Sequence, residues 1–145
     1  MHVASSESFN AFTRNSLKFF PYVESSLTDK NIDITGIKFI KNEYGNILIP
    51  SVVGINENDE VIVGELAKER RMLNPLDTAS NFKRKMGTNA KIRIKGKEFD
   101  AQMLSSLVLK HLKENAERQL GSEVDRAIIS VPAYFNDKQR KDTKI

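Results

Sequence analysis

A long amphipathic segment in the second half of this sequence has to lie on a hydrophobic core. Between residues 101 and 120, apolar side chains recur every three or four positions. On a helix they form one stripe, made of Leu104, Leu107, Val108, Leu112, Ala116 and Leu120. Asp100 can cap the start of this helix and Gly121 can close its end. Because a helix with one apolar face buries that face against other elements, the segment predicts a folded domain built around it.

The residues before this segment alternate between short apolar runs and clusters of turn residues. The predicted elements are strands at 32–40, 47–55 and 61–63, a short helix at 65–73, a second short helix with Thr78 as its N-cap, and a hairpin at 91–99. The turn residues between the strands favour an antiparallel meander. Phe82 and Met86 form the apolar side of the second short helix. Lys83 is rotated away from that side, so we expect it to project from the helix. The hairpin is expected to turn at Gly96-Lys97.

The end of the sequence predicts one further strand and one further helix. Residues 124–131 are apolar almost throughout from Ala127 onward, which is typical of a strand covered on both faces in an α/β sheet. Pro132 ends this strand, and Asn136 or Asp137 can cap a helix that begins near Lys138. An interior strand needs a neighbour on each edge, and a helix of about two turns needs a docking surface. We therefore predict an α/β fold of which the chain holds an incomplete part.

The content of cysteine and histidine narrows the chemistry that the chain can perform. Its 145 residues include no cysteine, which excludes disulfides, thiolate metal sites and cysteine nucleophiles. His111 lies beside the helical stripe without an acidic or histidine partner at helical spacing, so we interpret it as a surface or half-buried residue. No apolar run is long enough to span a membrane, and no secretory signal pattern is visible at the start. We expect a cytoplasmic protein without a membrane partner.

A basic run between residues 83 and 97 contains no acidic side chain. Such a run is usually a solvated face, and the alternative is contact with the phosphates of a nucleotide or a nucleic acid. Nucleic acid is disfavoured, because no aromatic residue lies between Phe82 and Phe99 to stack on unpaired bases. The seven glycines occur singly and form neither a Walker-type loop nor a G-x-G-x-x-G motif. The pattern leaves one candidate phosphate-facing lysine, Lys83.

Three sequence blocks stand out by their residues, order and spacing. They are 42–46 leading through 50–53 to 63–67, then 74–78 followed by 82–87, and finally Ile129-Ser130-Val131-Pro132-Ala133-Tyr134-Phe135-Asn136-Asp137 followed by Gln139-Arg140 and Thr143. Over about residues 37–145 they resemble the nucleotide-binding domain of the seventy-kilodalton heat-shock chaperones, the DnaK family, and most closely its HscC-type branch. Asp77 stands where the family usually has asparagine, and Ile49 where it usually has threonine.

The resemblance implies a fold, a set of site residues and a function. The fold is the actin-like, ribonuclease H-like ATPase, and the chain corresponds to part of its lobe I. Lys83 falls on the catalytic lysine that reaches the terminal phosphates and the attacking water. Pro132 falls on the proline that relays nucleotide state to the peptide-binding domain, and Arg140 on the arginine that works with it. The implied cofactors are ATP and magnesium. The implied partners are unfolded polypeptides, J-domain co-chaperones and a nucleotide exchange factor.

The family's phosphate-binding loops have no counterpart in these residues. Sequences of the family begin with a strand and a phosphate-binding turn that reads D-L-G-T-T, and residues 1–36 contain no such motif. The second phosphate-binding loop of the family, D-x-G-G-G-T, is also absent from these residues. We expect residues 1–36 to be a divergent, poorly ordered segment, and residues 37–145 to be a partial lobe I truncated at both ends. Without the backbone amides and carboxylates of those loops, the chain alone is predicted to be inactive as an ATPase. The alternatives are a non-catalytic module that docks co-chaperones and a weak basic binder of nucleic acid.

Overall fold

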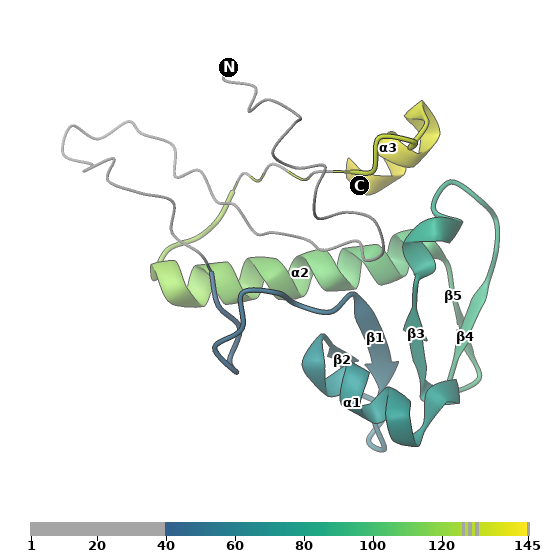
Figure 1. The fold of residues 1–145 in the computed structure, drawn as a ribbon, viewed down its shortest axis with the longest axis horizontal. Coiled ribbons are helices and arrows are strands. Elements are labelled where there is room, and N and C mark those ends of the chain that lie inside the picture. The colour runs from purple at the N-terminus through teal and green to yellow at the C-terminus, as the bar shows by residue number, and fades with distance from the viewer. Residues whose placement is uncertain (1–39, 126, 128, 130, 145) are drawn as a thin grey trace.

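The structure, a computed structural model, describes residues 40–144 apart from residues 126, 128 and 130 (Figure 1). The predicted segment 1–36, and the predicted strand 32–40 except for Ile40, lie outside the described residues. The remainder consists of helices and two small antiparallel sheets, which is compatible with the predicted α/β class. Among the described residues, no helix combines the length and the apolar composition that a membrane crossing requires.

A three-stranded antiparallel sheet forms the centre of this fold. Its strands are β1 (Val52–Ile55), β2 (Val61–Val63) and β3 (Thr78–Ser80), in the order β2-β1-β3. Residue Val53 of β1 is opposite Val63 on one side and Ala79 on the other. The predicted strands at 47–55 and 61–63 are therefore present and antiparallel. The first begins only at Val52, after Pro50, which has no N–H to donate to a ladder.

The prediction that Thr78 caps a helix was wrong, because Thr78 begins strand β3. Helix η1 (Pro75–Asp77) turns the chain back so that β3 pairs with the second edge of β1. Asn81 then takes a left-handed conformation, with φ of 57°, and the 3-10 helix η2 (Phe82–Lys85) follows it. The unpaired N–H and C=O groups along the edge of β1 favour a third strand over an earlier helix start.

Helix α1 (Glu65–Leu73) has the predicted bounds. It ends at Asn74, whose backbone N–H donates to the carbonyl oxygen of Arg70, and Pro75 prevents its continuation. The predicted hairpin consists of β4 (Ile92–Ile94) and β5 (Lys97–Phe99). Its turn lies one residue earlier than predicted, because Lys95 and Gly96 both have positive φ, of 48° and 77°. A two-residue turn of this hand matches the twist of the two strands.

Helix α2 (Ala101–Leu120) is the long helix that the apolar stripe predicts. The Asp100 carboxylate accepts a hydrogen bond from the backbone N–H of Met103 at 2.7 Å, and Gly121 closes the helix with φ of 69°. Figure 1 shows α2 lying across the strands of the central sheet. The shared core contains Val53, Ile55, Phe82, Ile94, Leu104, Val108 and Leu112.

The last predicted strand does not form among the described residues of 124–131. Ala127 and Ile129 are exposed and belong to no strand. A strand of this kind needs hydrogen-bonding neighbours on both edges, and neither of the two sheets in the described part of the chain extends to it. Helix α3 (Asp137–Lys144) follows as predicted. The Asn136 side chain caps it by accepting the N–H of Gln139 at 2.9 Å.

Candidate functional site

Lys83 lies on η2, a single turn held between strand β3 and helix α2. Its neighbour Phe82 is 1% exposed and belongs to the core, which fixes the turn against α2. Lys83 itself is only 6% exposed. The expectation that Lys83 projects from its helix was therefore wrong. A short turn packed against a neighbouring helix can bury two consecutive residues, here Phe82 and Lys83. The helical period of the sequence places Lys83 on a different side from Phe82 and so predicts that it is exposed.

Burial changes the acid–base chemistry of Lys83. Removal of water disfavours the charged ammonium and lowers the pKa of Lys83 from 10.5 to about 7. A lysine with such a pKa gains or loses its proton near neutral pH, and an anion placed beside it would favour the charged form. A titratable group perturbed by burial is a candidate functional group. Lys83 is the only buried lysine among the described residues.

The other members of the basic run belong mostly to a solvated face. Arg93 pairs with Glu98 at 2.9 Å across the hairpin. Lys95 pairs with Asp59 at 2.8 Å and donates to the carbonyl oxygen of Asn56 at 2.7 Å. The remaining basic side chains are exposed, namely Arg84, Lys85, Lys91 and Lys97. Because two of the bases are already paired with acids, the run offers less free positive charge than its sequence indicates.

Pro132 and Arg140 are brought together through Phe135. The backbone N–H of Phe135 donates to the carbonyl oxygen of Pro132 at 3.0 Å. The carbonyl oxygen of Phe135 accepts the Nε–H of Arg140 at 3.1 Å. Phe135 is 6% exposed, so a buried ring anchors the backbone that both residues contact. Arg140 is exposed and Pro132 is half-buried.

Helix α3 also contacts the backbone that follows η2, which sequence reasoning missed. Gln139 donates from Nε2 to the carbonyl oxygen of Met86 at 3.1 Å. Lys138 donates from Nζ to the carbonyl oxygen of Gly87 at 2.9 Å. The one signal in the sequence was Gly87 itself, since a glycine can mark a place where another segment approaches the backbone closely. These contacts connect the segment of Pro132 and Arg140 to the segment of Lys83.

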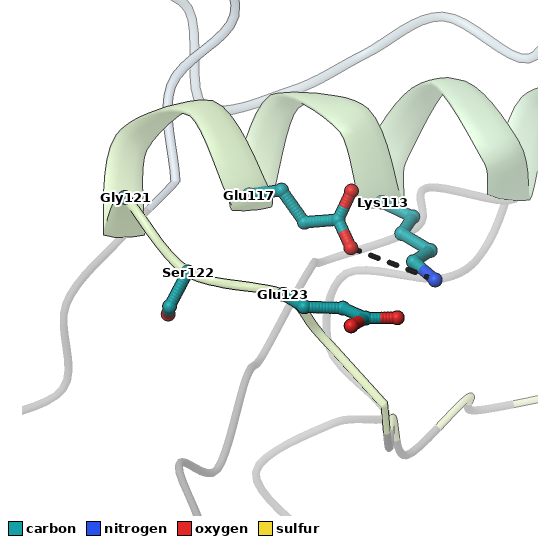
Figure 2. Close-up of a pocket in the computed structure, with 5 residues that line it drawn as sticks. All are labelled: Lys113, Glu117, Gly121, Ser122 and Glu123. Carbon is teal, nitrogen blue, oxygen red and sulfur yellow. Dashed lines mark ion pairs between the residues drawn. The ribbon is translucent and has the colours of Figure 1, made fainter.

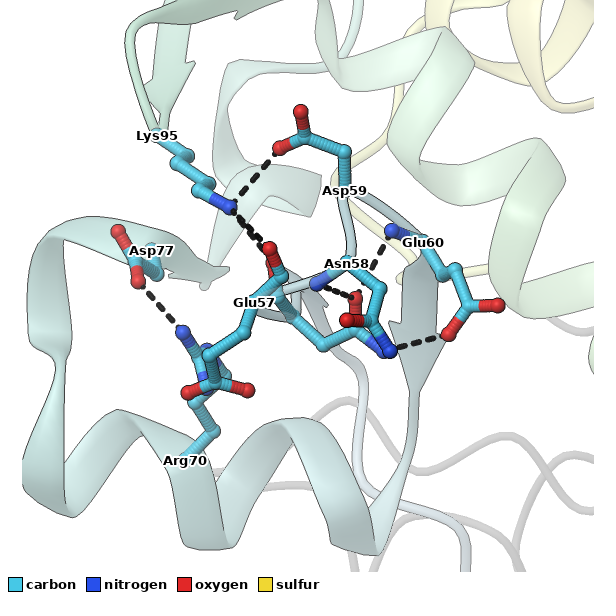
Figure 3. A network of polar contacts seen from close by, with 8 residues as sticks. Glu57, Asn58, Asp59, Glu60, Arg70, Asp77 and Lys95 are labelled. Atoms are coloured by element: carbon cyan, nitrogen blue, oxygen red, sulfur yellow. Dashed lines mark hydrogen bonds and ion pairs between the residues drawn. The ribbon is translucent and has the colours of Figure 1, made fainter.

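A second polar cluster, also missed, lies around the turn between β1 and β2 (Figure 3). Arg70 on α1 bridges Glu57 and Asp77, with 2.8 Å between its Nη2 and the Asp77 Oδ2. The hydrogen bond from Arg70 lowers the pKa of Glu57, and the hydrogen bond from Lys95 lowers the pKa of Asp59. The cluster joins the β1–β2 turn to α1, η1 and the β4–β5 turn. We assign it a structural role.

Neither of two surface cavities in the described part of the chain is lined by Lys83. One, of about 340 Å³, lies between the loop after η2 and the start of α2, and α3 contributes Lys138 and Asp142. The other, of about 460 Å³, is an open depression at the C-terminal end of α2 (Figure 2). There Lys113 and Glu117 form an ion pair at 3.5 Å on the helix surface. Neither cavity encloses a set of groups that explains binding of a nucleotide.

Comparison with known proteins identifies the family. A family model described as "Hsp70 protein" matches residues 32–94 and 88–145, and so covers most of the chain. The chain belongs to the Hsp70 family. The blocks that carry the sequence resemblance all lie within these matched residues of the Hsp70 chain.

Curated relatives of the Hsp70 chain are named Chaperone protein DnaK. The proteins from Thermotoga neapolitana and Thermotoga maritima are each 47% identical to it over 108 residues, which is 74% of the chain. The protein from Thermosipho melanesiensis is 44% identical over 110 residues, or 76% of the chain. Each match covers 18% of the relative, so the Hsp70 chain spans about a fifth of the length of these chaperones. The predicted relation to DnaK-type heat-shock chaperones is confirmed.

Proposed function

We propose that residues 37–145 form part of lobe I of an actin-like, ribonuclease H-like nucleotide-binding domain in an ATP-dependent Hsp70 chaperone. The observation that carries the proposal is Lys83, a lysine buried on a turn that the core residue Phe82 anchors. Membership of the Hsp70 family and the position of Lys83 in the matched residues support the same assignment. We propose further that the chain is closest to the HscC-type branch.

Lys83 is the residue of this chain that we propose for catalysis and nucleotide binding. Its desolvated amine suits a polyanion, because approaching phosphates favour the protonated form that burial disfavours. The rigid turn would hold that ammonium near the terminal phosphates of ATP and the attacking water. There it would offset the charge that develops on the transferred phosphoryl group. A charge-assisted hydrogen bond of this kind contributes about 1.5–3 kcal/mol.

We can name no magnesium ligands in the described part of the chain. Among those residues, no group of three or more His, Asp or Glu side chains is placed to bind a metal ion. We therefore derive no step through magnesium from these residues. A magnesium–ATP complex remains our proposal for the whole protein, in which carboxylates outside the described residues would hold the metal.

The chaperone role extends the proposal to partners. We propose ATP-driven binding and release of unfolded polypeptides in the cytoplasm, with J-domain co-chaperones and a nucleotide exchange factor. Pro132 and Arg140 are proposed as the relay between nucleotide state and the peptide-binding part of the protein. Their shared contact with Phe135 supports this pairing, because a movement of either one reaches the other through one buried residue.

The 145-residue chain by itself should bind ATP poorly. A triphosphate is usually held by several backbone amides, and these residues contain no glycine-rich phosphate loop. Isothermal titration with ATP and magnesium should show no dissociation constant at or below the micromolar range, and no hydrolysis should be measurable. Micromolar binding that the Lys83→Met substitution abolishes would contradict the predicted poor binding of ATP and would support the role proposed for Lys83. Micromolar binding that this substitution leaves unchanged would contradict both the predicted poor binding and the proposed role of Lys83 in nucleotide binding.

A non-catalytic docking module is the second candidate, and one surface favours it. Met72, Leu73 and Leu76, at the end of α1 and on η1, are 86%, 82% and 85% exposed. Neighbouring exposed apolar side chains of this kind often mark a protein-binding surface. A pull-down with purified DnaK or exchange factor, without nucleotide, should recover the partner if the chain docks in this way. The Leu76→Lys substitution should abolish that recovery.

A further inference from the structure

Helix α3 holds the backbone after η2 at two consecutive residues. Gln139 donates from Nε2 to the carbonyl oxygen of Met86 at 3.1 Å, and Lys138 donates from Nζ to that of Gly87 at 2.9 Å. We call these two contacts the α3 clasp. The residues that meet are more than fifty positions apart in the sequence. The contacts therefore belong to the tertiary fold and not to a local turn.

The side-chain amide of Gln139 is used at both ends. Its Oε1 accepts the backbone N–H of Asn136 at 2.9 Å, while the Asn136 side chain accepts the backbone N–H of Gln139 at 2.9 Å. This reciprocal pair is a capping box at the start of α3. With Oε1 engaged by the cap, Nε2 is directed to Met86. The cap thereby orients the donor of the clasp.

Gly87 is the residue that allows Gln139 to lie so close. A Cβ atom at position 87 would come within 2.7 Å of the Gln139 Cγ, which is closer than real Cβ contacts. Gly87 also has φ of 79°, a conformation that favours glycine. Two independent features therefore require glycine here, and one of them is the contact with α3.

The clasp bears directly on the turn that carries Lys83. The backbone N–H of Met86 donates to the carbonyl oxygen of Lys83 at 3.1 Å and closes η2, while the carbonyl oxygen of Met86 is held by Gln139. A single 3-10 turn has poor hydrogen-bond geometry and depends on such outside contacts. Gln139 adjoins Arg140, which contacts Phe135. One short helix thus touches both the Lys83 turn and the Pro132–Phe135 segment.

We propose that Gln139 is a positioning residue that holds the η2 turn, and with it Lys83, in register with the segment of Pro132 and Arg140. The proposal rests on the function proposed above for Lys83. A displacement of α3 would pull on Met86 and loosen or shift the turn. Gln139 has no contact with a reacting group in this proposal, and it acts only through the Met86 backbone.

The test compares two substitutions in α3 of the 145-residue chain by amide hydrogen exchange. Gln139→Glu keeps the oxygen that accepts from Asn136 but removes the donor to Met86. Thr143→Ala removes a different α3 contact, the 2.8 Å hydrogen bond from its hydroxyl to the Gln139 carbonyl oxygen. We expect exchange at the Met86 amide to be about three- to tenfold faster in Gln139→Glu, the range for one lost hydrogen bond. Exchange there should be unchanged in Thr143→Ala.

The second readout is the NMR signal of the Lys83 side chain, with ¹³C at Cε and the exposed lysines as internal standards. Gln139→Glu should shift this signal, and Thr143→Ala should leave it unchanged. Amides in the middle of α2, such as that of Val108, report global unfolding and should exchange equally in all variants. If Gln139→Glu impairs folding, Lys138→Met supplies the test, because it removes the contact with Gly87 and leaves the contact of Gln139 with Met86 in place. It also removes the 3.3 Å ion pair of Lys138 with Asp142, so Asp142→Asn is its control. Lys138→Met should then raise exchange at Thr88, whose N–H donates to the Lys85 carbonyl oxygen.

The outcomes separate this inference from the proposed function. Unchanged exchange at Met86 and an unchanged Lys83 signal in Gln139→Glu would overturn the clasp, whatever the titration with ATP gives. Equal effects of Gln139→Glu and Thr143→Ala would overturn it as well, since both would then reflect only the stability of α3. A positive exchange result combined with ATP binding that Lys83→Met leaves unchanged would leave a clasp that positions a structural turn, and would overturn the role proposed for Lys83 alone.

Discussion

The Nε–H of Arg140 donates to the carbonyl oxygen of Phe135 at 3.1 Å. The backbone N–H of Phe135 donates to the carbonyl oxygen of Pro132 at 3.0 Å, so one buried residue, Phe135, links the two proposed relay positions. The Phe135 ring meets the ring of Tyr134 edge to face, with centroids 5.6 Å apart. This arrangement gives the segment a fixed geometry without regular secondary structure, which suits a connection that transmits movement.

Arg140→Lys should loosen this segment although it keeps the positive charge. A lysine has no Nε–H at the position that contacts Phe135, and its compact ammonium is directed differently. We expect amide exchange at Phe135 to rise a few-fold, because the loss of one partly buried hydrogen bond costs roughly 0.5–1.5 kcal/mol. Lys141→Ala, on the exposed neighbour, is the control. Equal exchange rates in Arg140→Lys and the unsubstituted chain would refute the link.

The stability of the chain should rise with pH above neutrality because of Lys83. The folded pKa of about 7 lies below the ordinary 10.5, so between these values the unfolded chain binds a proton that the folded chain lacks. The free energy of unfolding therefore rises from about pH 7 to about pH 10, and the full cost of burying the charge is present below pH 7. Denaturant titrations at pH 6, 8 and 9.5 would measure this slope.

Lys83→Met should remove that slope and stabilise the chain at pH 6. The gain is on the order of a few kcal/mol, because each unit of pKa shift corresponds to about 1.4 kcal/mol. The advantage over the unsubstituted chain should shrink as pH approaches 10. Lys85→Met, on the exposed side of η2, should leave the pH dependence unchanged. A parallel pair of curves for Lys83→Met and the unsubstituted chain would show that burial does not perturb Lys83.

Gly87→Ala should destabilise the chain more than Gly96→Ala. The two glycines have nearly the same φ, 79° and 77°, so alanine meets a similar backbone strain of about 1–2 kcal/mol at each. A Cβ at position 96 meets no atom within 4 Å, whereas one at position 87 meets the Gln139 Cγ. We expect an added cost of about 1–3 kcal/mol at position 87 from this overlap. Thermal unfolding followed by circular dichroism would compare the two variants, and equal losses would argue against close packing of α3 on η2.

The polar cluster at the β1–β2 turn should make the chain sensitive to acid. Glu57 and Asp59 have pKa values held below their ordinary 4.5 and 3.8, so the stabilisation is present above those values and is lost as pH falls through the folded pKa values. Asp59→Asn removes the pair with Lys95 while tolerating the left-handed backbone at this position, φ 63°. We expect part of the loss of stability below about pH 4 to disappear in this variant. Glu98→Gln, which removes the exposed pair with Arg93, should retain the acid sensitivity.

Asp100→Ala should weaken the start of α2. The carboxylate accepts the N–H of Met103 at 2.7 Å, and loss of such a cap costs about 1 kcal/mol. Asp100→Asn keeps an acceptor at the same place and should cost at most a few tenths of that amount. The unfolding midpoints of the two variants in urea should therefore differ. Coincident midpoints would mean that the cap does not contribute to the stability of α2.

The elements with strong local signals were predictable from the sequence. Helices α1 and α2 have the predicted bounds, because their stop signals, Asn74-Pro75 and Gly121, act on the residues beside them. The capping of α2 by Asp100 is equally local. The family relation was predictable for a different reason, since the sequence signature around Pro132 is specific in its residue types and spacing. None of these inferences needs a contact between distant residues.

The site depends on distant contacts, and there the tertiary structure decided. Whether Thr78 starts a helix or a strand depends on the open edge of β1, and whether Lys83 projects or is buried depends on α2. The contact of Gln139 with Met86 joins residues whose separation leaves no periodic signal. Local propensity acts over a few residues, whereas burial, paired strand edges and shifted pKa values arise only when separate segments exclude water from one another.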